Sequence, residues 1–477
     1  MTLATVDRYD QEQVSAIGDR AVVVGGSMAG LCAARVLADG FDEVVIIERD
    51  SLPDEPVTHD GVPQSTHPHI MQEAGRATLE DFFPGFGEKL LSEGGLLIDG
   101  STEVKSYDEG GFTANPESRL PMYSSSRALF EWVVRWHVTR IENVSLRDEC
   151  QFSDYLLDNS ETAVTGVAFR DEQGAETTLA ADLVVDATGR TSRTPQWLED
   201  HGYEAPPVDE VEVDLTYSTI QIERPPDDRR LFFDLPSSPR TRGSAFIPIE
   251  ENRWEVIMSG VHGDAAPADK EKYVEFAESL PVDELGELVK SQSWVSDEIH
   301  QYPFPANRRQ HYEQVDDFPD GLVVTGDAIA SFNPIYGQGM AVAALDALLL
   351  HHCLADGGRA NLAPRFFKRA AETIDTVWML GVGADFDFPQ TTGPKPFGTD
   401  LVNRYVARLT RQAHSDRVLS EVFARVLRLE QPPTTLFRPN VVWRVFLPSP
   451  QSSLTRYLTL ARQRTSSTAS ISQSRSH

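Results

Sequence analysis

A glycine-rich turn, Gly25-Gly26-Ser27-Met28-Ala29-Gly30, joins a short apolar stretch to an amphipathic segment. Its spacing is that of the fingerprint that binds the pyrophosphate of a dinucleotide: Gly25 permits a tight turn, and Gly30 permits close packing of a helix on a strand. Ser27 stands where a second glycine is usual, and its hydroxyl can add a phosphate contact. Glu48 follows at the distance at which a carboxylate accepts hydrogen bonds from a ribose. The alternative, a glycine-rich turn without a ligand, leaves Glu48 and the flanking elements unexplained.

Two later stretches also place polar residues at the ends of predicted buried strands. Asp186-Ala187-Thr188-Gly189-Arg190 ends the strand 183–186, and Gly326-Asp327 ends the strand 322–325. Ligands of open α/β sheets bind at the carboxyl ends of such strands. The loop 332–339 then leads into a long apolar helix, whose first backbone N–H groups would attract an anion.

Three further side chains have types that suit a ligand site. Arg127 falls in the first turn of a helix predicted after three serines, where a cation opposes the helix dipole unless an anion lies nearby. We therefore expect it to contact a cofactor, the alternative being a surface arginine. His67 and His69 flank one proline without a carboxylate or cysteine at ligand spacing, so we expect no metal. They contact the cofactor or substrate from an active-site loop, or they form hydrogen bonds that only hold that loop.

The elements that must position these residues alternate between strand and helix at first and then become mainly strands. A strand, helix and strand over 21–47 form a βαβ unit, a three-stranded meander follows over 151–180, and long strands dominate from 202 to 302. We expect the last group to form one wall of a substrate cavity, with Tyr217 and Phe246 facing it. A purely stabilising or dimerising sheet is the alternative.

These patterns predict an α/β fold with an inserted sheet. Its predicted parts are a nucleotide-binding domain in two pieces (18–201 and 303–384), a mainly antiparallel β-sheet substrate domain (202–302), a C-terminal helical region (385–462), and disordered polar tails (1–17 and 463–477).

Cysteine usage and hydropathy bear on the compartment. Cys32, Cys150 and Cys353 are widely spaced and form no CxxC pair, which is typical of reduced thiols in a cytoplasmic protein. No apolar run approaches a membrane span, and residues 1–19 lack an export pattern, so we expect no transmembrane segment.

The charge of the chain limits the classes of partner that it is expected to bind. The formal net charge is −30 at pH 7, and only seven of the 43 basic residues are lysines. Such a composition resembles that of proteins from extreme halophiles. It argues against nucleic acid and anionic membranes as partners.

The three polar motifs together resemble the para-hydroxybenzoate-hydroxylase-like flavoprotein monooxygenases, often called group A. Their order, from the glycine turn through Asp186–Arg190 to Gly326-Asp327 and NPIYGQGM, is that of the family. Within it, GVPQSTHPHIM at 61–71, Asn307-Arg308-Arg309 and the strand around Tyr217 look closest to the bacterial polyether epoxidases. The resemblance implies a Rossmann-like FAD-binding domain of the glutathione-reductase type.

The resemblance also implies non-covalent FAD and a place for it. The glycine turn would hold the pyrophosphate, Glu48 the adenosine ribose, Arg127 the phosphates or adenine side, and Asp327 the ribityl chain. The implied cofactor-binding residues are Gly25, Ser27, Met28, Ala29, Gly30, Glu48, Arg49, Arg127, Asp186, Gly326, Asp327, Pro334, Gly337, Gly339 and Met340. The last four would lie against the pyrimidine edge of the flavin, and the helix start there would stabilise negative charge on the reduced ring.

By the same resemblance, NAD(P)H or a partner reductase reduces the flavin, O2 gives a flavin hydroperoxide, and one oxygen atom passes to a small apolar substrate by hydroxylation or epoxidation. No catalytic triad is expected; Tyr217, Phe246, His67 and His69 are the substrate-side candidates. Related halogenases carry WxWxIP, where this chain has Phe246-Ile247-Pro248-Ile249, so halogenation is not expected. The alternatives are a prenyl double-bond reductase, although its PxxYxWxFP pattern is missing, and a flavin-binding protein without turnover.

The charge yields a first prediction. Excess negative charges repel one another in dilute buffer, where the Debye length is about 30 Å at 0.01 M, and are screened in 1 M salt, where it is about 3 Å. We expect melting temperature and flavin retention to rise with potassium chloride into the molar range. Differential scanning fluorimetry with flavin release measures both; a melting curve that does not change with salt would contradict the halophile interpretation.

Overall fold

The computed structural model describes residues 1–59 and 63–447, and its centre is a five-stranded parallel sheet in the order β18-β12-β1-β2-β8. Val24 pairs with both Asp186 and Ile47, and Asp186 pairs with Val324, so the strands end at one level. This register brings the glycine turn, the Asp186 turn and the Gly326 turn to one edge of the sheet. The strands are β1 (Gly18–Val24), β2 (Phe41–Ile47), β8 (Val144–Arg147), β12 (Leu183–Asp186) and β18 (Leu322–Val324).

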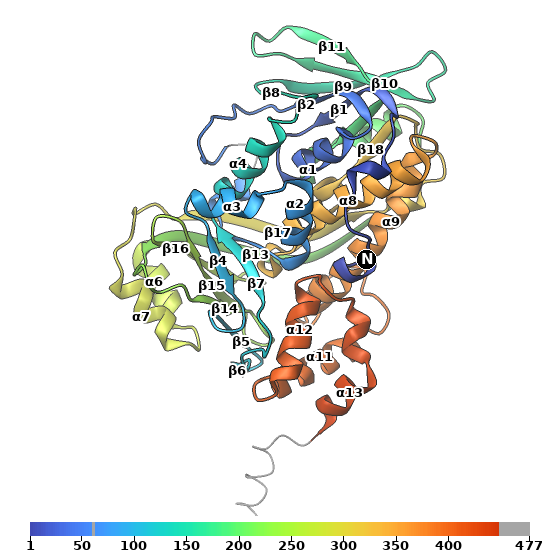
Figure 1. Ribbon diagram of the computed structural model, residues 1–477. Coiled ribbons are helices and arrows are strands. Elements are labelled where there is room, and N and C mark those ends of the chain that lie inside the picture. The colour runs from blue at the N-terminus through green and yellow to red at the C-terminus, as the bar shows by residue number, and fades with distance from the viewer. Residues whose placement is uncertain (60–62, 448–477) are drawn as a thin grey trace, which may run out of the picture.

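Apolar helices cover this sheet and supply most of the main core. The helix α8 is long and apolar enough to cross a membrane, contrary to the expectation from sequence. However, 78% of its most apolar 18-residue stretch is buried inside the protein, as in the core helix of a globular domain. The helices α1, α2 and α9 pack against α8 (Figure 1). The helices are α1 (Met28–Leu37), α2 (Glu73–Phe82), α3 (Phe86–Ser92), α4 (Arg127–Val138), α5 (Thr194–Asp200), α8 (Gly339–Gly357) and α9 (Leu362–Val377).

The second large element is an eight-stranded sheet in the order β19-β17-β13-β16-β15-β14-β5-β6. It extends beyond the predicted 202–302 boundaries, because β5 and β6 come from an earlier excursion of the chain and β17 and β19 from a later part. Two helices, α6 (Lys270–Glu278) and α7 (Asp283–Ser291), cover one of its faces (Figure 1). The strands are β5 (Val104–Asp108), β6 (Gly111–Phe112), β13 (Val208–Glu223), β14 (Leu231–Asp234), β15 (Arg242–Ile249), β16 (Arg253–Gly260), β17 (His300–Gln310) and β19 (Ala330–Ser331).

Two three-stranded sheets complete the strand content described. The predicted meander forms β9 (Gln151–Leu157), β10 (Val164–Arg170) and β11 (Glu176–Ala180). The other sheet joins β3 (His69–Met71), β7 (Pro121–Ser125) and β4 (Leu96–Asp99). Because the chain pairs β3 with β7 over His69–Met71, the following helix α2 begins only at Glu73.

The C-terminal helices are α10 (Gly383–Asp385), α11 (Thr399–Ala413), α12 (Arg417–Leu427) and α13 (Pro439–Phe446). Asp385 ties this region to the loop after β19, since its carboxylate accepts hydrogen bonds from Asn307, Asn333 and Tyr336. Burial raises the pKa of Asp385 to about 6, and the three donors oppose that rise.

The N-terminal arm differs from the disordered tail that its polar composition predicted. Leu3 N–H donates to the carbonyl of Leu429 at 3.0 Å, and the Tyr9 hydroxyl donates to Asp39 at 2.6 Å. Thr2 is fully buried. Backbone pairing with a distant segment thus fixes a stretch that composition alone cannot place. The predicted tail 463–477 lies outside the described residues.

Candidate functional site

A cavity of about 740 Å³ lies between the carboxyl edge of the parallel sheet and the eight-stranded sheet. Most of the sequence-predicted cofactor residues line it, namely Gly25, Ser27, Met28, Ala29, Glu48, Arg49, Arg127, Asp186, Asp327, Pro334, Gly337, Gly339 and Met340. Gly30 and Gly326 lie behind this wall, where they allow close packing. The cavity falls within the size range of small-molecule and cofactor sites.

The glycine turn meets the steric demands that its spacing predicted. Gly25 has a φ of +108°, and a Cβ there would lie 2.5 Å from the carbonyl oxygen of Ala187. A Cβ on Gly30 would lie 1.8 Å from the carbonyl oxygen of Gly25. Neither position can take a side chain without moving the backbone, so both glycines hold α1 against β1 at the cavity.

Glu48 is held by the backbone of the turn itself. Its carboxylate accepts a hydrogen bond from Gly26 N–H at 2.6 Å and another from Asp50 N–H at 3.0 Å. Each oxygen keeps a further lone pair for a ligand hydroxyl. The acid therefore has a fixed position at the end of β2, as a ribose contact requires.

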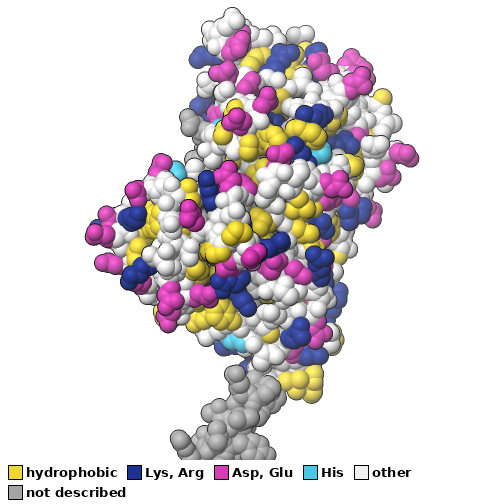
Figure 2. All heavy atoms as spheres, turned by 60° about the vertical axis from the view of Figure 1, so that its left-hand side comes forward, with side chains coloured by type: hydrophobic (Ala, Val, Ile, Leu, Met, Phe, Trp, Pro, Cys, Tyr) yellow, Lys and Arg dark blue, Asp and Glu magenta, His cyan; other side chains and the backbone are white. Residues whose placement is uncertain are grey.

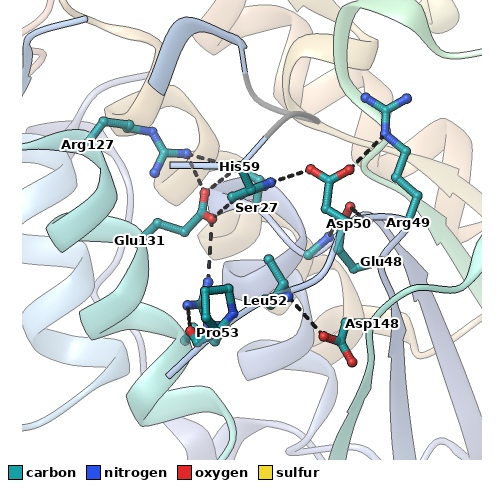
Figure 3. A network of polar contacts seen from close by, with 12 residues as sticks. Ser27, Glu48, Arg49, Asp50, Leu52, Pro53, His59, Arg127, Glu131 and Asp148 are labelled. Carbon is teal, nitrogen blue, oxygen red and sulfur yellow. Dashed lines mark hydrogen bonds and ion pairs between the residues drawn. The ribbon is translucent and has the colours of Figure 1, made fainter. Parts of the chain in front are cut away.

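Beside the turn, a buried ionic network surrounds Ser27 (Figure 3). The Ser27 hydroxyl donates to Glu131 at 2.7 Å and accepts from Arg127 at 2.8 Å. Arg127 forms an ion pair with Glu131 at 2.9 Å, one turn further along α4. His59 bridges Glu131, at 2.7 Å, and Asp50, at 2.5 Å. A loop, a helix and the glycine turn thus meet at one carboxylate.

The network keeps both of its central groups charged at neutral pH. Burial alone would lower the pKa of His59, but Glu131 and Asp50 outweigh it and raise the pKa to about 9. Burial alone would raise the pKa of Glu131, but Arg127, His59 and Ser27 lower it to about 2. His59 is therefore an imidazolium and Glu131 a carboxylate.

Unused hydrogen-bond donors around the cavity fit a phosphate-bearing cofactor. Arg127 is 4% exposed, and its Nη1 has no partner in the part of the chain that the structure describes. Ser27 precedes α1 but its side chain does not cap the helix, and neither does the side chain of Gln338 before α8. Both helix starts therefore keep backbone N–H groups and positive potential for an anion.

Asp327 projects into the cavity, so its side chain is accessible from the cavity although protein surrounds it. Burial raises its pKa, against the charges of Arg190 and Arg127. A ligand hydroxyl would satisfy this carboxylate, as the predicted ribityl contact requires.

Asp186, in contrast, already has its partners. One carboxylate oxygen accepts from the backbone and hydroxyl of Thr188, and the other accepts from Ser192 and Thr194 at 2.5 Å each. The carboxylate of Asp186 therefore holds the shape of the turn after β12 and is not free to contact a ligand directly. Arg49 lines the cavity, with its Nε 3.6 Å from an oxygen of Asp50.

The substrate-side candidates separate into two groups. His67 Nδ1 lies 2.7 Å from Thr219 Oγ1, and its ring meets those of Tyr217 and Tyr302 edge to face, with centroids at 4.5 Å and 5.9 Å. These three rings line the cavity, whereas Phe246 does not. Phe246 points to the opposite face of the sheet, into the core beneath α6, where it meets Phe232.

Both loop histidines are neutral at physiological pH. Burial lowers the pKa of His67 to about 3 and that of His69 to about 4. His69 lines the cavity, and its Nδ1 lies 2.7 Å from the carbonyl oxygen of His67. Among the described residues, no group of three His, Cys, Asp or Glu side chains could hold a metal ion.

Sequence reasoning missed Glu131, His59 and Tyr302. Glu131 stands four residues after Arg127 on a predicted helix, a spacing that indicates an ion pair and could have revealed it. His59 stands in a loop without periodicity, and Tyr302 needed the strand pairing with Tyr217 that only the fold shows.

The parallel sheet, the glycine turn and the spare anion donors define a nucleotide-cofactor-binding α/β protein. The family described as "FAD binding domain" matches residues 125–361, which include Arg127, Asp186 and Asp327. "Protein Rv3254" of Mycobacterium tuberculosis is 32% identical over 425 residues, covering 85% of this chain and 89% of that protein. The chain belongs to this family of FAD-dependent oxidoreductases, which includes monooxygenases; FAD is its cofactor, and NAD(P)H is the reductant typical of the family.

More distant similarities also extend over most of this chain. "Squalene monooxygenase 1,1" of Brassica napus is 24% identical over 340 residues, covering 70% of this chain and 62% of that protein. PqsL of Pseudomonas aeruginosa, described as a probable FAD-dependent monooxygenase, superposes with a TM-score of 0.57 at 19% identity, over 86% of this chain and 99% of its own. The flavin-dependent brominase Bmp2 gives 0.62 at 15% identity, over 92% and 99%.

The geometry of Asp327 yields a prediction about FAD binding. We expect Asp327→Ala to raise the FAD dissociation constant about 30-fold, because losing one buried hydrogen bond to a charged acceptor costs about 2 kcal/mol. Fluorescence titration of the apoprotein measures the constant. Asp316→Ala, an exposed carboxylate on the preceding loop, is the matched control. Normal affinity in a folded Asp327→Ala protein would remove the assignment.

The network yields a prediction about pH. The pKa of His59 is 6.5 in the unfolded chain and about 9 in the folded protein. The charged His59 therefore contributes its full stabilisation below pH 6.5, and this stabilisation is lost as the pH rises through about 9. We expect His59→Gln to destabilise the protein by about 2 kcal/mol near neutral pH, once partial solvent screening is allowed for, and by little near pH 10.

Melting temperatures of wild type and variant from pH 6 to pH 10 measure this difference. The control His352→Gln changes a histidine that bonds only a backbone carbonyl, so its profile should run parallel to that of the wild type. If the profile of His59→Gln also runs parallel to that of the wild type, Glu131 and Asp50 do not raise the pKa of His59.

Proposed function

We propose that this enzyme transfers one atom of O2 to an apolar organic substrate, by epoxidation or hydroxylation, with NAD(P)H as the electron source. The observation that carries the proposal is that one continuous cavity joins the glycine turn and Asp327 to the aromatic wall of His67, Tyr217 and Tyr302. A cofactor at the first end and a substrate at the second would share one space.

Bound FAD supplies the redox and oxygen chemistry. The chain supplies binding and orientation: Arg127 and the start of α1 suit the pyrophosphate, and the start of α8 suits negative charge beside Gly337 to Met340. Because His67 is neutral and already engaged with Thr219, we assign it to orientation of the substrate and not to proton transfer.

Apolar side chains should keep water from the reaction. Ile257, Phe304 and Ile335 line the cavity near the tyrosines, and water in such a site diverts reduced oxygen to hydrogen peroxide. The squalene monooxygenase likeness supports an alkene as the target, and epoxidation is therefore our first choice within the class. We also propose, from the three buried free thiols of the described chain, that the enzyme works in the cytoplasm.

The test supplies holoenzyme with NAD(P)H, ¹⁸O2 and an alkene panel of squalene and geranylgeraniol. We expect NAD(P)H oxidation to rise with an alkene and the product to carry one ¹⁸O atom by mass spectrometry. Saturation of a double bond without oxygen, under anaerobic conditions, would instead identify a prenyl reductase. Absence of any NAD(P)H oxidation would favour a flavoprotein without turnover.

Tyr217 provides the accompanying prediction. Its hydroxyl makes no hydrogen bond with the described residues, and its ring lines the cavity. If it orients the substrate, Tyr217→Phe should raise the hydrogen peroxide formed per NAD(P)H severalfold and leave FAD content unchanged. Tyr107→Phe, on the opposite face of the same sheet, is the control. An unaltered coupling ratio would make Tyr217 a packing residue only.

A further inference from the structure

The charge of the chain is strongly uneven at its C-terminal end. The formal net charge is −30, yet the described residues 385–447 contain nine lysines and arginines against six aspartates and glutamates. The exposed side of α11 adds Arg404 and Arg408. The argument from net charge against anionic surfaces therefore does not apply to this end of the molecule.

The same end exposes large apolar side chains. Among the described residues, the large hydrophobics that are more than half exposed are Phe397, Leu401, Trp443 and Phe446, at 109%, 68%, 69% and 59%. Elsewhere among the described residues, no exposed side chain of this kind exceeds 46%. Scattered apolar side chains are ordinary on a protein surface, but a gathered set marks an interaction site.

We define the C-terminal apolar surface as the exposed hydrophobic side chains of this region: Phe397, Leu401, Phe437, Trp443, Phe446 and Leu447. Tyr405 connects its two helices, because its ring stacks on Phe437 at 5.1 Å and lies 6.4 Å from Phe446. Arg408 lies over the ring of Phe446 at 4.9 Å and donates to the carbonyl of Val445 at 2.9 Å. Hydrophobic side chains are visible at the lower end of the molecule in Figure 2.

Basic and apolar side chains alternate across this surface. Leu401, Arg404, Tyr405 and Arg408 follow one another along one side of α11, at the spacing of a helix face. Arg438, which stands between Phe437 and α13, is exposed and, like Arg404, makes no ion pair within the described ranges. A mixed surface of tryptophan, phenylalanine and unpaired arginine suits the headgroup region of a bilayer.

We propose that the C-terminal apolar surface docks the enzyme on an anionic lipid membrane. The aromatic rings would enter the interface while the arginines contact lipid phosphates, with neither helix crossing the bilayer. A second copy of this chain fits less well, since a two-fold contact would bring the same unpaired arginines face to face. The proposal goes beyond the proposed reaction and does not depend on it.

The helices α11 and α13 that carry this surface share a hydrophobic core with α12, and α12 contacts the cavity wall. Gln338 lines the cavity wall and donates to the carbonyl of Leu427, at the end of α12, at 2.9 Å. Docking would therefore hold the cavity close to the phase in which an apolar substrate dissolves.

The test measures flotation of the FAD-loaded enzyme with vesicles of phosphatidylcholine alone or with 30% phosphatidylglycerol. We expect binding to the anionic vesicles, weaker in 1 M potassium chloride because salt screens the arginines. Trp443→Ser with Phe446→Ser, and separately Arg404→Gln with Arg438→Gln, should each weaken binding about tenfold or more. Phe112→Ser, an exposed aromatic on β6, is the control and should bind like wild type.

Two results would overturn the proposal. One is wild-type enzyme that stays unbound with anionic vesicles, or surface variants that bind as wild type does. The other is a concentration-dependent dimer in sedimentation that the Trp443 and Phe446 changes abolish, which would make a second copy the partner. FAD content and melting temperature verify folding of each variant. Because flotation needs no turnover, its failure and a failure of the oxygen-transfer assay are separate results.

Discussion

The site depends on the close approach of α1 to the end of β1. The carbonyl oxygen of Gly25 occupies the space that a Cβ on Gly30 would need, 1.8 Å away, so the helix can begin at the sheet edge only because both residues are glycine. The parallel register then carries the Asp186 turn and the Gly326 turn to the same edge. The inferred cofactor contacts of the glycine turn and of Asp327 follow from this arrangement.

Electrostatics at this edge follow from one buried carboxylate. Glu131 faces Arg127 and a positively charged His59, while Arg135 lies 3.8 Å from it. Burying an ion pair is costly unless each charge has hydrogen bonds, and here Ser27 and His59 supply them. Arg127 still keeps one unused donor, its Nη1, for an anion. The network therefore holds Arg127 in place without using all of its donors.

Local pattern predicted the parts of the fold that local physics decides. The βαβ unit, the meander and the α4 helix with its serine cap follow from periodicity and turn chemistry, and the structure contains each of them. Tertiary pairing decided the rest. His59 reaches Glu131 across 72 positions, and residues 1–17 are fixed by contacts such as the one from Leu3 to Leu429, which no window of sequence contains.

Phe246 shows that a shift of one residue along a strand decides whether a side chain lines the cavity or joins the core. Side chains alternate between the faces of a strand, so Ala245 and Ile247 line the cavity while Phe246 joins the core under α6. Aromatic character alone could not assign the face; the pairing of β15 with β16 does.

The two faces of the eight-stranded sheet therefore have different roles. Tyr217, Ile257 and Tyr302 lie on the face that lines the cavity, whereas Ile220, Trp254 and Met258 lie on the face that packs beneath α6 and α7. Large changes in the second set create cavities or strain in a packed core, but changes in the first set alter the shape of an open space. Substrate preference in this fold can therefore change through every second residue of a strand while the core that supports the strand stays the same.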